Sequence, residues 1–294
     1  MKRVHRFYSD NLFLRATSVI STDVVREMCT IQKAAPLATM ALGRAVTGAI
    51  LMAAQLRDKQ VVALHFRGNG PLGSIYAEAS YEGECRGWCD HPEAAVPFKN
   101  GRIDVAAGLG IGLLNVIRSQ PFEKAPHIGT VELATSEIGD DIAYYLHQSH
   151  QTPSVIALGA VLNTDGQVEV AGGVLIELMP GASDAIISEL EASVRTAKPL
   201  AEMLSNGCNP IELLTNFVGT IPMNPSEHPF DIKYTCRCSL DRAERSINML
   251  GRDEIKEIVS LGVASNVRCD FCGRSYSISL ERLREMLTQF DVMN

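Results

Sequence analysis

Four cysteines near the end of the chain are the residues whose type and spacing are best suited to chemistry. They form two close pairs, Cys236-Arg-Cys238 and Cys269-Asp-Phe-Cys272, and residues 239–268 separate the pairs. Four thiolates in two such pairs can surround one zinc ion tetrahedrally. The sequence therefore predicts one zinc ion per chain, with these four cysteines as its ligands.

Oxidation of the same thiols offers a second interpretation of the motif. Cys236 and Cys238 would close a small, strained ring, and strained, exposed disulfides are the labile, regulatory kind. We expect the products Cys236–Cys238 and Cys269–Cys272. Their formation removes the zinc ligands, so the metal is released and its contribution to the folding free energy is lost. From the spacing alone, a purely structural zinc site and a redox switch both remain open.

The segment that carries the cysteines, residues 232–294, is small. Some sixty residues bury little apolar area, and chains of this size often need a metal or a disulfide to fold. We therefore expect a zinc-binding redox-switch domain over this range, with folding coupled to the metal. Its expected elements are a helix capped by Ser239 and ending at Gly251, a helix over 253–261, a strand at Tyr276 and Ile278, and a last helix from Leu280.

A helical, punctuated stretch over residues 181–231 precedes this module. Ser183 can cap a helix that ends near Ala197, and two prolines at 199 and 210 begin shorter helices. Residues 222–226 are expected as open chain, since two of the five are proline. The stretch is too short for a core of its own, so its apolar faces must lie on another surface. We interpret it as a regulatory linker that can detach conditionally.

The first region, residues 1–180, mixes helices with strands. Apolar strands over 61–66 and 74–80 flank a Gly-Asn-Gly-Pro turn, and strands over 155–162 and 168–178 flank Asp-Gly. A long apolar helix over 37–56 follows a proline. The fold class predicted for the chain is α+β: a mixed α/β core with a hairpin-built sheet, a helical middle region, and a small C-terminal four-cysteine zinc domain.

Composition limits the classes of partner. The chain has 294 residues, is 46% hydrophobic and carries a net charge of −7, with a pI of about 5.5 and a mean hydropathy of +0.05. Bulk charge therefore favours neither nucleic acid nor an anionic membrane. The most apolar stretch, 34–56, is interrupted by polar residues and is interpreted as a buried helix, not a membrane span. No signal peptide is expected, so we expect a cytoplasmic protein whose cysteines bind metal or are redox-active.

The remaining cysteines are interpreted as ordinary thiols. Cys85, Cys89 and His91 form a Cys-x-x-x-Cys-x-His pattern, but no fourth ligand is evident, and a strand end with buried cysteines is the simpler explanation. Cys29 and Cys208 are isolated in the sequence, and Cys208 becomes accessible if the middle region unfolds.

The chain resembles one family, heat shock protein 33, whose members are redox-regulated holdase chaperones. The resemblance extends along essentially the whole chain, and the spacing of the two cysteine pairs is its most specific part. Two departures are visible: His150 stands where the family usually has Glu, and Leu240-Asp241 replaces a basic-acidic pair. The matching residues are Cys236-Arg-Cys238-Ser239, Leu250-Gly251, Glu254-Ile255, Cys269-Asp-Phe-Cys272, Tyr276, Gly83, Arg86-Gly87, 129–133, 141–145, Ser149, 151–154, Gly172-Gly173 and 175–181.

The resemblance implies a mechanism. In the reduced form zinc orders the C-terminal module, the middle region packs on the core, and the protein is inactive. Peroxide with heat, or hypochlorous acid, forms the two disulfides and releases zinc. The middle region then unfolds and exposes apolar surface that binds unfolding client proteins without ATP. The active form of the family is a homodimer, and the protein is not an enzyme.

Two other classes of function compete with this one. A zinc-ribbon protein that binds nucleic acid should show a basic face, but residues 232–294 carry ten Lys and Arg against nine Asp and Glu, a net charge of +1. A dithiol oxidoreductase should place its Cys-x-x-Cys at the start of a helix after a strand, and this context is absent from the sequence pattern. No nucleic-acid or membrane partner is therefore expected.

Overall fold

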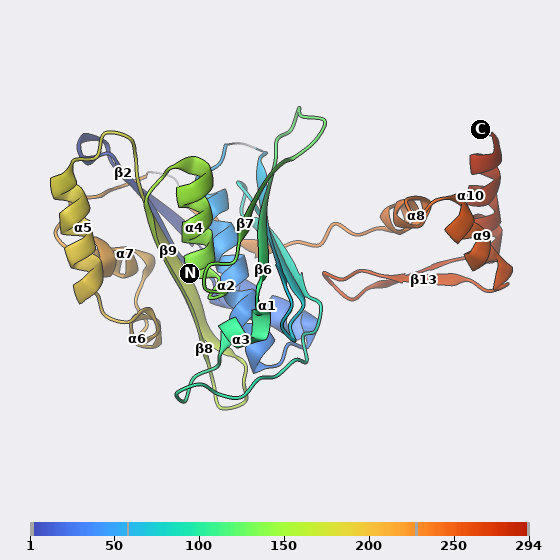
Figure 1. Ribbon diagram of the computed structural model, residues 1–294, viewed down its shortest axis with the longest axis horizontal. Coiled ribbons are helices and arrows are strands. Elements are labelled where there is room, and N and C mark those ends of the chain that lie inside the picture. Colours follow the sequence, from blue (N-terminus) through green and yellow to red (C-terminus); the bar gives the residue numbers. More distant parts are fainter. Residues whose placement is uncertain (1–2, 58, 227–228, 293–294) are drawn as a thin grey trace. The chain divides into compact units, whose positions relative to one another are not determined.

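The computed structural model describes residues 3–57, 59–226 and 229–292, without the side chains of residues 150, 291 and 292. The chain divides into two compact units, Met1–Thr235 and Cys236–Asn294 (Figure 1). Helices and strands are mixed in the first unit, and the second contains the four cysteines. The predicted α+β fold class is confirmed.

One six-stranded sheet of the first unit, called sheet A here, is antiparallel throughout. Its order is β10-β1-β2-β9-β8, and β11 also pairs with β1. The predicted hairpin is β8–β9, and its turn contains Gly166 with a φ of +76°, a backbone conformation that favours glycine. The strands are β1 (Arg3–Ser9), β2 (Leu14–Ile20), β8 (Ser154–Leu162), β9 (Val168–Leu178), β10 (Asn224–Pro225) and β11 (Phe230–Asp231).

The second six-stranded sheet of this unit, sheet B, has the order β12-β5-β4-β3-β6-β7. Its pairs are antiparallel except β12 with β5, which is parallel. The other predicted hairpin is β3–β4. The strands are β3 (Val61–Gly68), β4 (Ser74–Ser80), β5 (Glu84–Cys89), β6 (Gly112–Ser119), β7 (His127–Glu132) and β12 (Lys233–Tyr234).

Helix α2 (Pro36–Ala53) lies between the two sheets and contacts strands of both (Figure 1). Its length and composition would suffice for a membrane span, but 83% of it is buried within the unit, as expected for a core helix. The main core lies around this helix, between the inner faces of the sheets. The other helical segments of this part are η1 (Asp10–Leu12), α1 (Thr22–Gln32), α3 (Val105–Leu109) and α4 (Gly139–His150).

Three helices of the middle region cover the other face of sheet A: α5 (Asp184–Thr196), α6 (Leu200–Ser205) and α7 (Pro210–Val218) (Figure 1). Side chains alternate along a strand, so β2 presents Leu14 and Ala16 to these helices and Val19 to the main core. This second cluster, called the outer cluster, comprises the buried residues Phe7, Leu14, Ala16, Val174, Ile176, Leu178, Leu190, Leu204, Leu213, Leu214, Phe217, Val218 and Ile221.

The middle region begins as the sequence predicts, because the Ser183 hydroxyl accepts a hydrogen bond from the amide of Ile186 and caps α5. Its end differs from the prediction. Residues 222–226 were expected as open chain, but Asn224 and Pro225 pair with β1 as β10. Two-residue strands show no periodicity in a sequence, and an edge strand tolerates proline. The prediction of open chain is therefore wrong at these two residues.

The second unit is small. Its helices are joined by an ion pair between Arg282 of α10 and Glu244 of α8, with a nitrogen–oxygen distance of 2.8 Å. Its buried apolar cluster, within the described residues, comprises Ala243, Ile247, Ile255, Ile278, Leu283 and Met286. The elements are α8 (Leu240–Asn248), α9 (Arg252–Ser260), β13 (Ser265–Arg268), β14 (Ser275–Ile278) and α10 (Leu280–Val292), and all correspond to predicted elements except β13.

Candidate metal centre

Two separate segments carry the cysteine pairs. Cys236 and Cys238 lie in the irregular stretch between β12 and α8. The next residue, Ser239, accepts a hydrogen bond from the amide of Arg242 at 3.2 Å and caps α8. Since this cap begins the helix directly after Cys238, it holds the first pair at the end of an ordered element.

The second pair lies in the turn of the β13–β14 hairpin. The amide of Cys269 donates to the carbonyl of Arg274 at 2.9 Å, and the amide of Gly273 donates to the carbonyl of Cys269 at 2.8 Å. Gly273 has a φ of +69°, which side chains with a Cβ rarely adopt. The turn therefore folds Cys269 and Cys272 back toward the same point.

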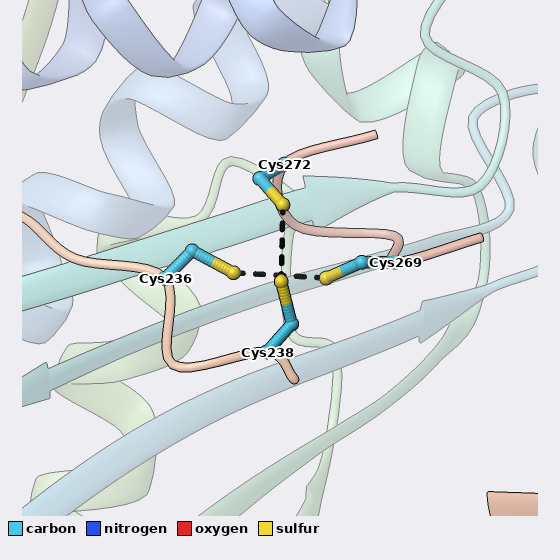
Figure 2. Close-up of side chains that lie close together, drawn as sticks. All are labelled: Cys236, Cys238, Cys269 and Cys272. Carbon is cyan, nitrogen blue, oxygen red and sulfur yellow. Dashed lines mark hydrogen bonds between the residues drawn. The ribbon is translucent and has the colours of Figure 1, made fainter. Parts of the chain in front are cut away.

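The four sulfur atoms point toward one another (Figure 2). All lie within 4.8 Å of each other. The Cys236–Cys269 sulfur distance is 3.6 Å and the Cys238–Cys272 distance is 3.4 Å. In a tetrahedral zinc site, Zn–S bonds of about 2.3 Å separate the sulfurs by about 3.8 Å. The donor set and its spacing fit one tetrahedral metal ion.

Tyr276 on β14 acts directly on this cluster. Its hydroxyl donates a hydrogen bond to the Cys238 sulfur at 3.1 Å. Burial alone raises the pKa of Cys238, but hydrogen bonds from Tyr276 and the neighbouring thiols outweigh it and lower the pKa to about 7. Thiolate is the form of cysteine that binds metal. The hydrogen bond from Tyr276 therefore favours the form of Cys238 that a metal ion would need.

The three cysteines of the main core have the opposite character. Burial raises the pKa of Cys29 and of Cys85 to about 12, and that of Cys89 to about 11. Cys85 and Cys89 lie buried on β5, as predicted for a strand end, and His91 is exposed. Within the described ranges, Cys236, Cys238, Cys269 and Cys272 form the only group of three or more potential ligands at metal-binding distance. The interpretation of the Cys85 pattern as buried thiols is confirmed.

Cys208 lies half-buried in the middle region and packs at the margin of the outer cluster. Burial raises the pKa of its thiol. Of the two departures from the family pattern, Leu240 begins α8 with its side chain partly exposed, and the side chain of residue 150 lies outside the described part. Neither position belongs to the sulfur cluster.

The sequence placed Tyr276 on a strand and among the residues that match the family, but it did not indicate the hydrogen bond to the Cys238 sulfur. The signal is the spacing: four residues after Cys272, on the returning strand of the hairpin, a side chain can reach back over the turn. Which sulfur it reaches depends on the packing of the first pair against the hairpin. That packing is a tertiary contact between residues 38 positions apart.

Comparisons with known proteins agree with one another. The model of the Hsp33 protein family matches residues 2–279. The 33 kDa chaperonin of Desulfotalea psychrophila is 39% identical over 268 residues, which is 91% of this chain and 90% of that protein. The 33 kDa chaperonin of Geobacter sulfurreducens is 39% identical over 279 residues, which is 94% and 92% of the two chains.

A solved structure shows the same fold. The crystal structure of the 33 kDa chaperonin of Thermotoga maritima, a heat shock protein 33 homolog, matches with a TM-score of 0.86 and 27% identity. The match covers 100% of each chain. The four-sulfur cluster therefore belongs to a fold shared with a protein named a chaperonin.

Proposed function

Because the chain belongs to the Hsp33 family and the similar proteins described above are named chaperonins, we propose that it is a redox-regulated holdase that works without ATP. The observation that carries the proposal is the cluster of four sulfurs within 4.8 Å in a unit with a small apolar core. A unit of this kind folds when its thiolates share a metal and loses stability when they cannot.

Zinc is the proposed metal, held by Cys236, Cys238, Cys269 and Cys272. Four soft thiolates in a tetrahedral arrangement select zinc over the hard cations, which take oxygen ligands. When bound, zinc supplies the folding free energy of the second unit. Tyr276 contributes by donating its hydrogen bond to the Cys238 sulfur.

Oxidation acts on the sulfurs. A thiolate attacks a peroxide oxygen and becomes a sulfenic acid, and a neighbouring thiol displaces water from it to form a disulfide. Two peroxide molecules convert the four thiols into two disulfides and four water molecules. We propose the pairs Cys236–Cys238 and Cys269–Cys272, each formed by two cysteines that lie close together in the sequence. Disulfide sulfurs no longer bind the metal as thiolates, so the second unit loses its main source of stability.

The surface for clients is the one that the middle region covers. Helices α5, α6 and α7 bury an apolar face of sheet A that includes Phe7, Leu14 and Ile176. We propose that residues 181–231 act as a regulatory linker between a core domain over 1–180 and a redox-switch domain over 232–294. Once the linker unfolds, this face and the apolar sides of the helices are exposed, and exposed apolar patches bind other proteins.

Three further features belong to the same proposal. The active form is a homodimer, as the family resemblance implies. The location is cytoplasmic, since a four-thiol centre needs a reducing compartment. The protein acts by binding and not as an enzyme, and its partners are unfolding proteins, not nucleic acid or a membrane.

The test measures aggregation of a thermally unfolding protein by light scattering. The purified chain is added either reduced with zinc, or oxidised with zinc removed. We expect suppression by the oxidised form alone, with about one zinc released per chain, as a single four-cysteine site requires. Equal behaviour of the two forms with zinc retained would contradict the proposal, and nucleic-acid binding would then be tested.

A further inference from the structure

A short segment, residues 229–235, connects the edges of the two sheets in the first unit and is called the strap here. Its β11 part pairs with β1 of sheet A, and its β12 part pairs with β5 of sheet B. The last strap residue, Thr235, is joined by a peptide bond to Cys236. The strap is thus the part of the first unit nearest in sequence to the four clustered cysteines.

Backbone hydrogen bonds hold the strap on β5. The amide of Lys233 donates to the carbonyl of Gly83 at 2.9 Å, and the amide of Thr235 donates to the carbonyl of Cys85 at 3.0 Å. The Cys85 thiol also donates to the carbonyl of Lys233 at 3.5 Å. These bonds follow a strand ladder, so they depend on backbone shape more than on the identity of the strap side chains.

Gly83 shows how closely the strap lies on this edge. It has a φ of +84°, and a Cβ built on it would lie 2.1 Å from the carbonyl oxygen of Asp231. A residue with a side chain there would push the strap away. The edge at β5 is therefore shaped to receive an extended backbone.

The strap side chains alternate in the manner of a strand with one buried face. Ile232 is only 2% exposed and belongs to the main core, and Phe230 and Tyr234 pack against the same core. Between them, Lys233 forms an ion pair with Glu84 at 3.2 Å. The surface beside the β5 edge, called the slot here, thus accepts an apolar side chain from every second strap residue, and the basic Lys233 lies at its rim.

We infer that the edge of β5 is a strand-addition site for client proteins, which the strap occupies in the reduced protein. Since the other edge of β5 pairs with β4, loss of β12 leaves one row of unpaired backbone groups beside an apolar slot. Such an edge is a template for another extended chain. The ligand class is an extended polypeptide with alternating apolar residues, the kind of segment that aggregates when proteins unfold. This inference rests on the proposed function.

The first experiment uses a fluorescent peptide with the strap sequence Pro-Phe-Asp-Ile-Lys-Tyr-Thr, residues 229–235. We expect it to bind the oxidised full-length protein at least tenfold more tightly than the reduced protein, whose site is occupied. Saturating peptide should also reduce the suppression of client aggregation by the oxidised form.

Matched peptides test whether the binding is a strand ladder. Methylation of the Lys233 amide nitrogen removes one donor to β5 and should weaken binding about fivefold, the value of one backbone hydrogen bond. Methylation at Tyr234 is the control, because successive amides of a strand point to opposite sides and its amide does not face β5. Equal weakening by the two modifications would overturn the inference.

A locked variant tests the same site within the protein. Tyr234 is the register partner of Cys85 across the β12–β5 pair, so Tyr234→Cys places a thiol where a disulfide with Cys85 is sterically feasible. With that disulfide confirmed by peptide mapping, we expect oxidised protein that has lost zinc, no longer binds the strap peptide, and suppresses client aggregation less well than the oxidised wild type. Tyr234→Ser is the control.

The outcomes separate the inference from the proposed function. Oxidised wild-type protein that fails to suppress aggregation contradicts the function itself. If oxidised wild-type protein suppresses aggregation without binding the strap peptide, and the locked variant suppresses aggregation equally well, the β5 site is wrong and the proposed function stands.

Discussion

The two units of this chain bury apolar surface on very different scales. In the first unit, a long helix between two six-stranded sheets forms a continuous core, and a second apolar cluster lies outside sheet A. In the second unit, six buried side chains form the cluster within the described residues. Stability that comes from burial persists in any redox state, whereas stability that comes from thiolate ligands ends when they are oxidised. Under the proposed function, the chain therefore combines a permanent scaffold with a module whose stability depends on its redox state.

The outer cluster lies between these extremes. Its apolar face on sheet A belongs to the permanent scaffold, but the helices that cover it are short and are joined through the strap to Cys236. Short helices depend on tertiary packing for most of their stability. In the proposed mechanism, helices α5, α6 and α7 are the part of the first unit that unfolding of the second unit affects first.

The largest expected effect comes from removing a ligand. Cys236→Ser should abolish stoichiometric zinc binding and make residues 236–294 sensitive to protease, because structural zinc supplies about 10–16 kcal/mol of apparent folding free energy in small domains. Zinc is measured by a chromophoric chelator and unfolding by limited proteolysis. Cys208→Ser is the control. Unchanged protease resistance would show that the second unit does not need the metal.

The next effect tests the outer cluster directly. Leu213 of α7 is fully buried, so Leu213→Ala should destabilise the cover by about 2–5 kcal/mol. We expect the reduced, zinc-bound variant to suppress aggregation in part without oxidation. Ile211→Ala, on the same helix but 51% exposed, is the matched control. If α7 becomes sensitive to protease while the reduced variant stays inactive, the covered face is not the client surface.

A smaller effect is expected from Tyr276→Phe. This change removes the hydrogen bond that helps to lower the pKa of Cys238 to about 7. The pKa should rise, and protons should compete better with zinc, most strongly toward acidic pH. Loss of an outer-shell partner typically costs about 10–100-fold in metal affinity. Chelator competition across a pH series measures this loss. Tyr144→Phe on α4 serves as the control, and an affinity equal to wild type at every pH would remove Tyr276 from the site.

The smallest effect on zinc is expected from Cys85→Ser. Cys85 is buried on β5 and belongs to no described metal cluster, so zinc content should stay at one per chain. Metal analysis of the purified variant checks this. A loss of stoichiometric zinc would revive a site formed by Cys85, Cys89 and His91.

Much of the fold follows from local patterns in the sequence. The hairpins β3–β4 and β8–β9 have turn residues between alternating apolar runs. Helices α5 and α8 begin at Ser183 and Ser239, whose hydroxyls cap them as their positions predict. The four cysteines were identified by residue type and spacing alone. Each of these features depends on residues close together in the chain, so the sequence displays it.

Other features depended on contacts between distant segments. The outer cluster, the pairing of β12 with β5 and the hydrogen bond from Tyr276 join residues far apart in sequence. A two-residue strand such as β12 has no period to detect, and it forms only because β5 offers an unpaired edge. The sequence by itself determined the local elements and which four cysteines could together hold a metal ion. The tertiary structure alone decided what the middle region covers, because burial depends on which surfaces meet.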